Sequence, residues 1–303
     1  MAQVAENPLL EGLRARRAPE PCALVIFGAS GDLTQRKLFP ALYALAYRNL
    51  LPPQFGVVGV ARSDMTLDEF RERMRAAVEE HARDEFREDV WEQLAEGLRY
   101  VRADLADAED DEGIVEALND LDVARGTGGN RVYYLAVPPS AVEPIVLQLG
   151  RRRGTGGWTR VIVEKPFGHD LESARHLNEV VRTYFDESEI FRIDHYLGKE
   201  TVQNMLVLRF ANWNRQFVDH VQITVAESLG IEGRASFYEQ AGAIRDIVQN
   251  HMLQLVALTA MEPPIDFDAD SVRNEKVKVL RAVHTPGPKH VVRGQYGPGY
   301  IEG

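Results

Sequence analysis

This sequence of 303 residues has one cysteine, no long apolar run and a negative net charge. Cys22 is the only cysteine, which excludes an internal disulfide or a cysteine-based metal cluster and suits a reducing compartment, so we expect a cytoplasmic protein. No run of about 18 apolar residues is present, and we therefore expect no membrane span. The net charge of −11 disfavours nucleic acid and anionic membranes as partners, although a few local cations can still bind a small anionic ligand.

What is present is the composition of a globular protein, with 45% hydrophobic and 27% charged residues. The length is enough for one large or two ordinary domains. Residues 1–20 lack an apolar stretch, and we interpret them as a polar N-terminal arm and not as a signal peptide. We find no spacing typical of metal ligands and expect no metal site.

Strand and helix patterns alternate over residues 20–190. Short, continuous apolar runs predict buried parallel strands at Ala23–Phe27, from Phe55 in FGVVGVAR, at Val132–Val137 and at Val161–Val163. Helical spacing predicts helices at Leu33–Leu51, within residues 66–98, at Ile114–Leu121 and at Leu171–Phe185. The alternation predicts an α/β fold with a doubly wound parallel sheet, a Rossmann domain, which we place at residues 21–195.

The pattern changes in the last third of the chain. The segment HVQITVAES, residues 220–228, alternates apolar and polar residues and predicts a half-exposed strand of an antiparallel sheet. A long helix is predicted from Tyr238 to Met261, and the tail KHVVRGQYGPGYIEG predicts one strand followed by a glycine-rich loop. We assign residues 196–303 to an α+β domain that carries the substrate and catalytic groups.

A glycine turn, GASGDLT at residues 28–34, joins the first predicted strand to the first helix. Its G-x-x-G spacing differs from G-x-G-x-x-G and is a weak signal alone, but its place inside a βαβ unit favours dinucleotide binding at the helix N-terminus. Arg62 follows the second strand, where NAD-binding proteins carry an acidic residue, and Lys37 lies on the first helix. Both cations favour NADP; the alternative is that Arg62 is merely a surface residue.

His251 lies in the long helix on a predicted apolar stripe with Ile244, Val248, Leu255 and Leu258. It is either a core histidine or a base that faces a cleft, where a carboxylate would fix its tautomer. A base of this kind is what the oxidation of an alcohol by a nicotinamide cofactor requires.

Four stretches, in this order, carry a family resemblance: GASGDLTQRKLFP, IVEKPFG, RIDHYLGKE and IRDIVQNHMLQ. The chain resembles the glucose-6-phosphate dehydrogenase family from about Cys22 to its end. RIDHYLGKE is highly specific, whereas EKP also occurs in other sugar and cyclitol dehydrogenases.

The resemblance implies an NADP-dependent oxidation of D-glucose 6-phosphate to 6-phospho-D-glucono-1,5-lactone, the first step of the oxidative pentose phosphate pathway. It implies that His251 is the proton-accepting base, that Asp194 pairs with it, and that Lys165 lies between sugar and nicotinamide. It assigns the substrate phosphate to His195, Tyr196 and Lys199, and the sugar hydroxyls to Glu227 and Asp246. The NADP site implied by the resemblance comprises Gly28, Ser30, Gly31, Asp32, Leu33, Lys37 and Arg62, together with Lys165.

Asp246 poses a geometric problem for this assignment. It lies five residues before His251, and an ideal α-helix turns two such residues about 140° apart. Both can contact one sugar only if the helix is distorted or the substrate wraps around it.

Family members continue beyond the position that corresponds to Gly303, so we expect the second domain to lack its C-terminal part. A homo-oligomer is expected for the full-length family member and is in doubt for this shorter chain. Two alternatives stay open: another EKP-type sugar dehydrogenase with an unphosphorylated substrate, and a non-catalytic NADP-binding fragment.

Overall fold

The computed structural model describes residues 19–104, 112–151, 156–168, 170–205, 216–226, 235–295 and 297. The chain divides into two compact units between Ile193 and Asp194, and each unit is described by itself. In the part of the chain that the structure describes, no helix is long and apolar enough to cross a membrane.

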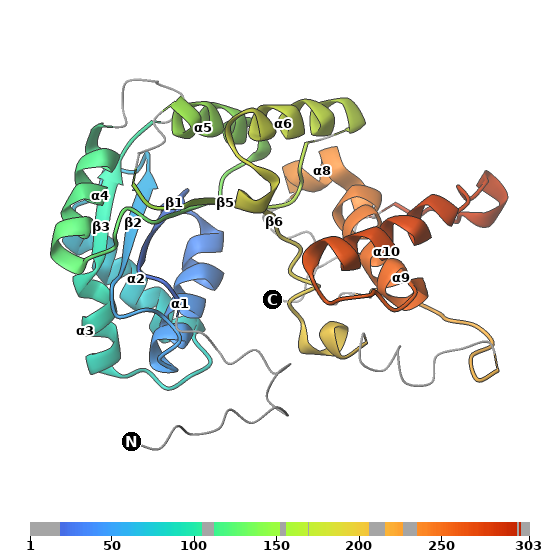
Figure 1. Cartoon of the computed structure of the whole chain (residues 1–303), viewed down its shortest axis with the longest axis horizontal. Helices are drawn as coiled ribbons and strands as arrows, with labels where there is room; N and C mark the ends of the chain where they lie inside the picture. The colour runs from blue at the N-terminus through green and yellow to red at the C-terminus, as the bar shows by residue number, and fades with distance from the viewer. Residues whose placement is uncertain are drawn as a thin grey trace, which may run out of the picture. The chain divides into compact units, whose positions relative to one another are not determined.

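The N-terminal unit is built on one sheet of six parallel strands, in the order β3-β2-β1-β4-β5-β6 (Figure 1). The strands are β1 (Cys22–Phe27), β2 (Phe55–Ala61), β3 (Leu98–Arg102), β4 (Arg131–Leu135), β5 (Thr159–Val163) and β6 (Ile190–Arg192). This order confirms the predicted doubly wound sheet. From β1 the chain adds strands first on one side and then, from β4 on, on the other side. Ligands of such sheets bind beyond the carboxyl ends of the strands at the point where the strand order reverses, here between β1 and β4.

Helices cover both faces of the sheet. The helices α1 (Phe39–Tyr47), α2 (Leu67–His81) and α3 (Glu88–Glu96) contribute to the core on one face. The helices α4 (Glu112–Arg125), α5 (Pro139–Arg151) and α6 (Leu171–Tyr184) contribute to the core on the other.

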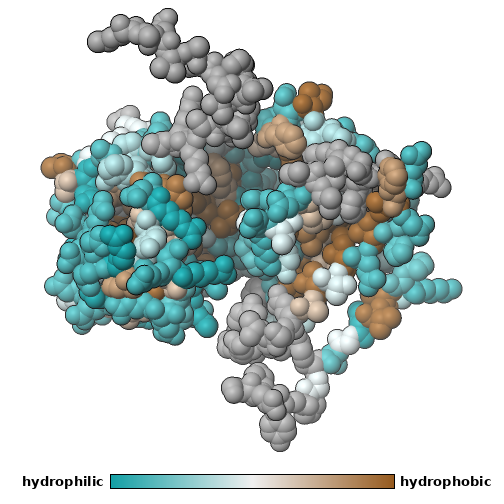
Figure 2. Space-filling view, turned by 90° about the horizontal axis from the view of Figure 1, so that it is seen from below, coloured by the Kyte–Doolittle hydropathy of each residue, from teal (hydrophilic) through white to brown (hydrophobic). Residues whose placement is uncertain are grey.

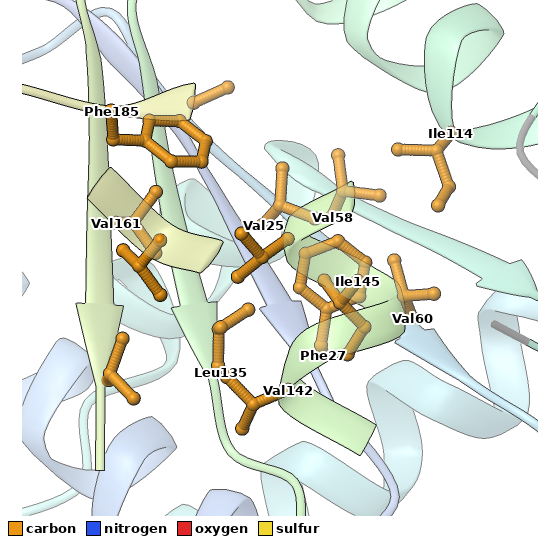
Figure 3. Close-up of a cluster of buried hydrophobic side chains, with 14 of the residues drawn as sticks. Val25, Phe27, Val58, Val60, Ile114, Leu135, Val142, Ile145, Val161 and Phe185 are labelled. Atoms are coloured by element: carbon orange, nitrogen blue, oxygen red, sulfur yellow. The ribbon is translucent and has the colours of Figure 1, made fainter. Parts of the chain in front are cut away.

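Alternation along the strands explains how one sheet serves two cores. Val25 and Phe27 belong to the cluster under α4, α5 and α6, which Figure 3 shows, whereas Leu24 and Ile26 belong to the cluster under α1, α2 and α3. Successive side chains of a strand point to opposite faces, so a strand that is buried on both sides has an uninterrupted apolar sequence. The apolar runs that predicted these strands are the direct consequence.

The regular secondary structure of the C-terminal unit, in its described residues, is helical. Residues 200–205 are helical, and α8 (Ala235–Ala243), a π-helix (Ile244–Met252) and α9 (Leu253–Ala260) follow one another where one long helix was predicted. The chain then forms α10 (Ala269–Ala282), which was not predicted. Val202, Leu258 and Met261 form a small buried cluster in this unit.

The two strands predicted for this unit do not form in its described residues. Residues 221–226 are irregular, and the tail contains a short 3₁₀ turn, Pro288–His290, followed by irregular residues 291–295. A strand is stable only when a neighbouring strand completes its hydrogen-bond ladder, and the described part of this unit supplies none. The alternating pattern of residues 220–228 was therefore a poor guide to the local structure.

Large apolar side chains remain exposed on the C-terminal unit. Brown residues gather on its visible face in the right half of Figure 2. The exposed set includes Phe217, Ile265, Phe267 and Val292. Within its described residues, this unit has a core of only a few residues, smaller than either core of the N-terminal unit.

Candidate active site

The glycine turn after β1 approaches the end of β4 so closely that only glycine fits. Gly28 has φ of 85°, and a Cβ atom there would lie 2.2 Å from the carbonyl oxygen of Ala136. Both the positive φ and the contact exclude other residues. The sequence thus places Gly28 at the point where the strand order reverses, as a dinucleotide site of this fold requires.

Thr34 occupies the position of the third glycine in the usual motif, and its side chain closes the turn. The Thr34 hydroxyl is buried and donates a hydrogen bond to the Gly28 carbonyl at 3.1 Å. The Gly31 N–H donates to the same carbonyl at 2.9 Å, and the helix starts at Asp32. The helix N-terminus therefore lies directly after the turn, where its free N–H groups suit a pyrophosphate.

Cations surround this turn. The Ser63 hydroxyl, at the end of β2, donates to the Ser30 hydroxyl at 2.9 Å, which brings the neighbouring Arg62 close to the turn. Arg62 and Lys37 are both exposed, and neither forms an ion pair within the described residues. These groups fit a phosphorylated dinucleotide.

Arg73 on α2 also contacts the turn, and sequence reasoning missed it. Its guanidinium donates to the Ser30 carbonyl at 3.3 Å and to the Gln35 side chain at 3.1 Å. Only the helical spacing of α2 marks this position in the sequence, and that spacing does not distinguish Arg73 from the other charged residues of the helix.

Lys165 lies just beyond the carboxyl end of β5 and is half-buried. The peptide bond to Pro166 is cis. The preceding residue, Glu164, accepts a hydrogen bond of 2.6 Å from the Tyr134 hydroxyl, and burial together with this carboxylate raises the pKa of Tyr134. The Tyr134 contact anchors the segment that presents Lys165.

The C-terminal unit contains a buried histidine–carboxylate pair. His251 is 1% exposed, and its Nδ1 lies 2.5 Å from Oδ1 of Asp194. The same carboxylate oxygen accepts the Tyr196 backbone N–H at 2.9 Å. An ionised carboxylate only accepts hydrogen bonds, so Nδ1 carries the proton and Nε2 of His251 keeps its lone pair for a second proton.

Three further side chains predicted for the substrate site lie around this pair. The Nε2 atom of His195 is 3.1 Å from Nε2 of His251, and the Tyr196 ring stacks on the His251 ring at 4.0 Å between centroids. The Lys199 ammonium lies 3.7 Å from the centroid of the Tyr196 ring. The short segment 194–199 thus places the residues that the sequence suggested around His251, and His195 contacts His251 itself.

The π-helix resolves the geometric problem of Asp246. Hydrogen bonds of the i→i+5 type bring residues five apart to nearly the same face, as i→i+4 bonds do in an α-helix. Asp246 and His251 are accordingly both buried, at 8% and 1% exposure. The predicted apolar stripe is correspondingly wrong in its first half, where Ile244 and Val248 are 60% and 39% exposed because the wider turn rotates them away from the face of His251. Its second half is confirmed, because Leu258 is buried and Leu255 packs against the cluster to which Leu258 belongs.

Gly242 marks where this distorted segment begins. Its φ of 60° and ψ of 176° interrupt α8, and this combination is almost restricted to glycine. Glu227, the other residue predicted to bind sugar hydroxyls, lies outside the described residues. In the described part of the chain, no group of three or more His, Cys, Asp or Glu side chains is placed to hold a metal ion.

The strand order and the glycine turn together define a dinucleotide-binding protein of the Rossmann class. Two family models match the chain. Residues 25–204 match the model described as glucose-6-phosphate dehydrogenase, NAD binding domain, and residues 204–303 match glucose-6-phosphate dehydrogenase, C-terminal domain. The chain belongs to the glucose-6-phosphate dehydrogenase family, and its N-terminal unit binds a nicotinamide dinucleotide.

Named relatives agree. The chain is 49% identical to glucose-6-phosphate 1-dehydrogenase 2 of Mycobacterium tuberculosis, covering 98% of this chain and 60% of the relative. It is 44% identical to glucose-6-phosphate 1-dehydrogenase of Chlamydia pneumoniae, covering 96% and 60%. The chain therefore spans about 60% of the length of these curated relatives.

Solved structures of the family superpose well on the chain. The crystal structure of glucose-6-phosphate 1-dehydrogenase from Mycobacterium avium is 42% identical with a TM-score of 0.79, and the match covers 92% of this chain and 60% of that one. A glucose-6-phosphate dehydrogenase in complex with glucose 6-phosphate is 38% identical with a TM-score of 0.78, covering 87% and 56%.

Proposed function

We propose that this chain forms the cofactor site and the catalytic base of an enzyme that oxidises D-glucose 6-phosphate to 6-phospho-D-glucono-1,5-lactone with NADP. The observation that carries the proposal is the contact of 2.5 Å between His251 and Asp194, with the imidazole 1% exposed. Membership of the family and the likeness to a structure that holds glucose 6-phosphate support the choice of substrate.

His251 acts as the proton acceptor. NADP, when bound, would accept the hydride that leaves C1. The proton of the C1 hydroxyl passes to Nε2 of His251 as the C1–O bond becomes a carbonyl, and Asp194 stabilises the imidazolium that forms. A base placed in this way contributes about 10²–10⁴-fold to the rate.

His195 occupies the acceptor nitrogen of His251 before substrate arrives. Its Nε2–H donates to Nε2 of His251 at 3.1 Å, so the substrate hydroxyl has to replace this hydrogen bond. The substrate phosphate offers His195 a stronger, charge-assisted partner, together with the Lys199 ammonium and the Tyr196 hydroxyl. Phosphate binding would thereby free the base for the C1 hydroxyl.

The cofactor is proposed to be NADP. A 2′-phosphate requires cations beyond the end of β2, and the exposed Arg62 and Lys37 supply them beside the glycine turn. Lys165, at the end of β5, is proposed to contact both nicotinamide and sugar. Glu227 and Asp246 are proposed for the sugar hydroxyls. We place the activity in the cytoplasm, where the free, buried thiol of Cys22 would stay reduced.

The assay is NADPH formation by the chain with NADP and glucose 6-phosphate, with unphosphorylated glucose as the matched substrate. Turnover that depends on the phosphate is the expected result. Equal rates with both sugars would contradict the proposed substrate and favour a related sugar dehydrogenase.

The glycine turn and the helix N-terminus after it also fit a second candidate, a unit that binds NADP without turnover. Calorimetry separates the two candidates. NADP binding with no NADPH formation by any preparation of the chain would support the binding unit and contradict catalysis by this chain.

A further inference from the structure

Helix α10 places one lysine on the face that packs against the small cluster of this unit. Val272, Lys276 and Val279 follow one another at spacings of four and three residues, which puts them on one stripe of the helix. Val272 and Val279 pack against the cluster of Val202, Leu258 and Met261. Lys276 lies between the two valines and is half-buried, whereas its helix neighbour Lys278 is exposed and pairs with Glu275.

The Lys276 ammonium is held at the element that carries the catalytic base. Its Nζ donates to the side-chain oxygen of Gln254 at 2.9 Å, and Gln254 follows His251 by three residues. Burial lowers the pKa of Lys276, and the negative charge of Asp194 acts in the opposite direction. The hydrogen bond to Gln254 thus holds the ammonium about one helical turn beyond His251, the residue that contacts Asp194.

Asp194 needs such a counter-charge. Its Oδ1 accepts hydrogen bonds from His251 and from the Tyr196 backbone, but its Oδ2 is buried and finds no hydrogen-bond partner within the described residues. A buried carboxylate oxygen without a partner is costly unless a positive charge lies near it.

We propose that Lys276 is a positioning residue for the Asp194–His251 pair: its ammonium balances the Asp194 carboxylate from α10 and so sets how strongly that carboxylate holds a proton on His251. The reasoning rests on the proposed function only in treating His251 as the base. Without the ammonium, the carboxylate would stabilise the imidazolium more strongly, and His251 would accept a proton more readily but release it less readily.

Other charged or titratable groups around His251 lie on different elements. His195 faces Nε2, Tyr196 stacks on the ring, and Lys199 lies beyond Tyr196, all on the segment 194–199. Asp246 lies on the π-helix itself. Lys276 reaches this region from α10 through its hydrogen bond to Gln254, so its charge can be removed without changing any residue that the proposed mechanism uses.

The test is an NMR titration of the His251 imidazole in the chain and in two variants, Lys276→Met and the matched control Lys278→Met. We expect Lys276→Met to raise the titration midpoint by about 0.5–1 pH unit, because a cation near the Asp194–His251 pair disfavours the imidazolium. Lys278→Met should leave the midpoint unchanged, and Lys276→Arg should restore it.

Activity provides a second readout. In Lys276→Met, the acid limb of the profile of kcat/KM against pH should move to higher pH by the same amount, while KM for glucose 6-phosphate stays unchanged. The NMR midpoint does not require turnover, so failure of the proposed function leaves this test intact. If Lys276→Met does not fold, Lys276→Gln takes its place. An unchanged midpoint in a folded, neutral variant, or an equal shift in Lys278→Met, would overturn the proposal.

Discussion

Nδ1 of His251 lies 2.5 Å from Oδ1 of Asp194, and this contact orients an imidazole that is 1% exposed and also contacts His195 and Tyr196. Replacement by asparagine would offer the imidazole a neutral partner and leave the imidazolium unstabilised. We expect Asp194→Asn to lower kcat by about 10²-fold or more, with little change in KM. Steady-state kinetics checks this.

The chain offers a matched control for that variant. Asp219 contacts His220 at 3.0 Å, but both side chains are exposed, so Asp219→Asn should leave kcat unchanged. Equal losses in the two variants would mean that kcat responds to lost charge in general and not to this pair.

Lys199 offers a test of phosphate recognition. Its ammonium lies over the Tyr196 ring, and a phosphate dianion gains most from a cation at short range. We expect Lys199→Met to raise KM for glucose 6-phosphate at least tenfold and to leave the slow reaction with unphosphorylated glucose unchanged. A KM that stays within twofold would remove Lys199 from the phosphate site.

Gly28 offers a test of the nucleotide turn. A Cβ atom at this position would lie 2.2 Å from the Ala136 carbonyl oxygen, and φ is 85°. We expect Gly28→Ala to destabilise the N-terminal unit by about 2–4 kcal/mol and to weaken NADP binding, as measured by urea unfolding and calorimetry. Gly156→Ala is the control, because a Cβ atom there would contact nothing within 4 Å.

The lowered pKa of Asp122 should make the free energy of unfolding depend on pH in the acid range. Burial raises the pKa of this carboxyl, but hydrogen bonds from Arg131, Thr127 and the Gly129 N–H outweigh burial and bring the pKa to about 2. A folded-state pKa below the unfolded value of about 3.9 stabilises the fold above that value, and this contribution disappears as pH falls towards 2.

We therefore expect Asp122→Asn to lose about 1–2 kcal/mol at neutral pH and to show a smaller loss of stability between pH 4 and pH 2 than the parent chain. Urea unfolding across this range is the measurement. The exposed pair of Arg87 and Asp89 supplies the control, since Asp89→Asn removes only a surface contact. A parallel decline for Asp122→Asn and the parent chain would assign the acid sensitivity to other groups.

The sequence predicted the N-terminal unit well because burial on both faces gives its strands uninterrupted apolar runs, as in Ala23–Phe27. The strand β6 has only three residues, too few for a pattern. In the C-terminal unit, the alternation of apolar and polar residues at 220–228 indicates a tendency to form a strand. A strand forms only when a partner strand completes its hydrogen bonds. The helix α10 did carry signals, namely an Asp268 N-cap and its valine stripe.

The resemblance predicted the contact between Asp194 and His251, but the other contacts of this cluster were not predicted. Motif residues such as Asp194 and His251 can be picked out of the sequence because their side chains are titratable. The π-helix that puts Asp246 on the same face as His251 leaves no periodic pattern of apolar residues in the sequence by which it could be predicted. Lys276 and Arg73 look like ordinary charged residues of amphipathic helices, and only their contacts in the folded chain, with Gln254 and Ser30, distinguish them from their neighbours. The same limit applies to the His195–His251 contact, which joins residues 56 positions apart in the chain.

The most direct test of the central claim compares the chain with His251→Asn for NADPH formation from glucose 6-phosphate, with binding of both ligands followed by calorimetry. Asparagine retains polarity but cannot accept the hydroxyl proton. The account predicts a loss in kcat of about 10²–10⁴-fold, with both dissociation constants within about threefold of the parent values. A kcat within tenfold of the parent, with binding intact, would contradict the assignment of His251 as the base.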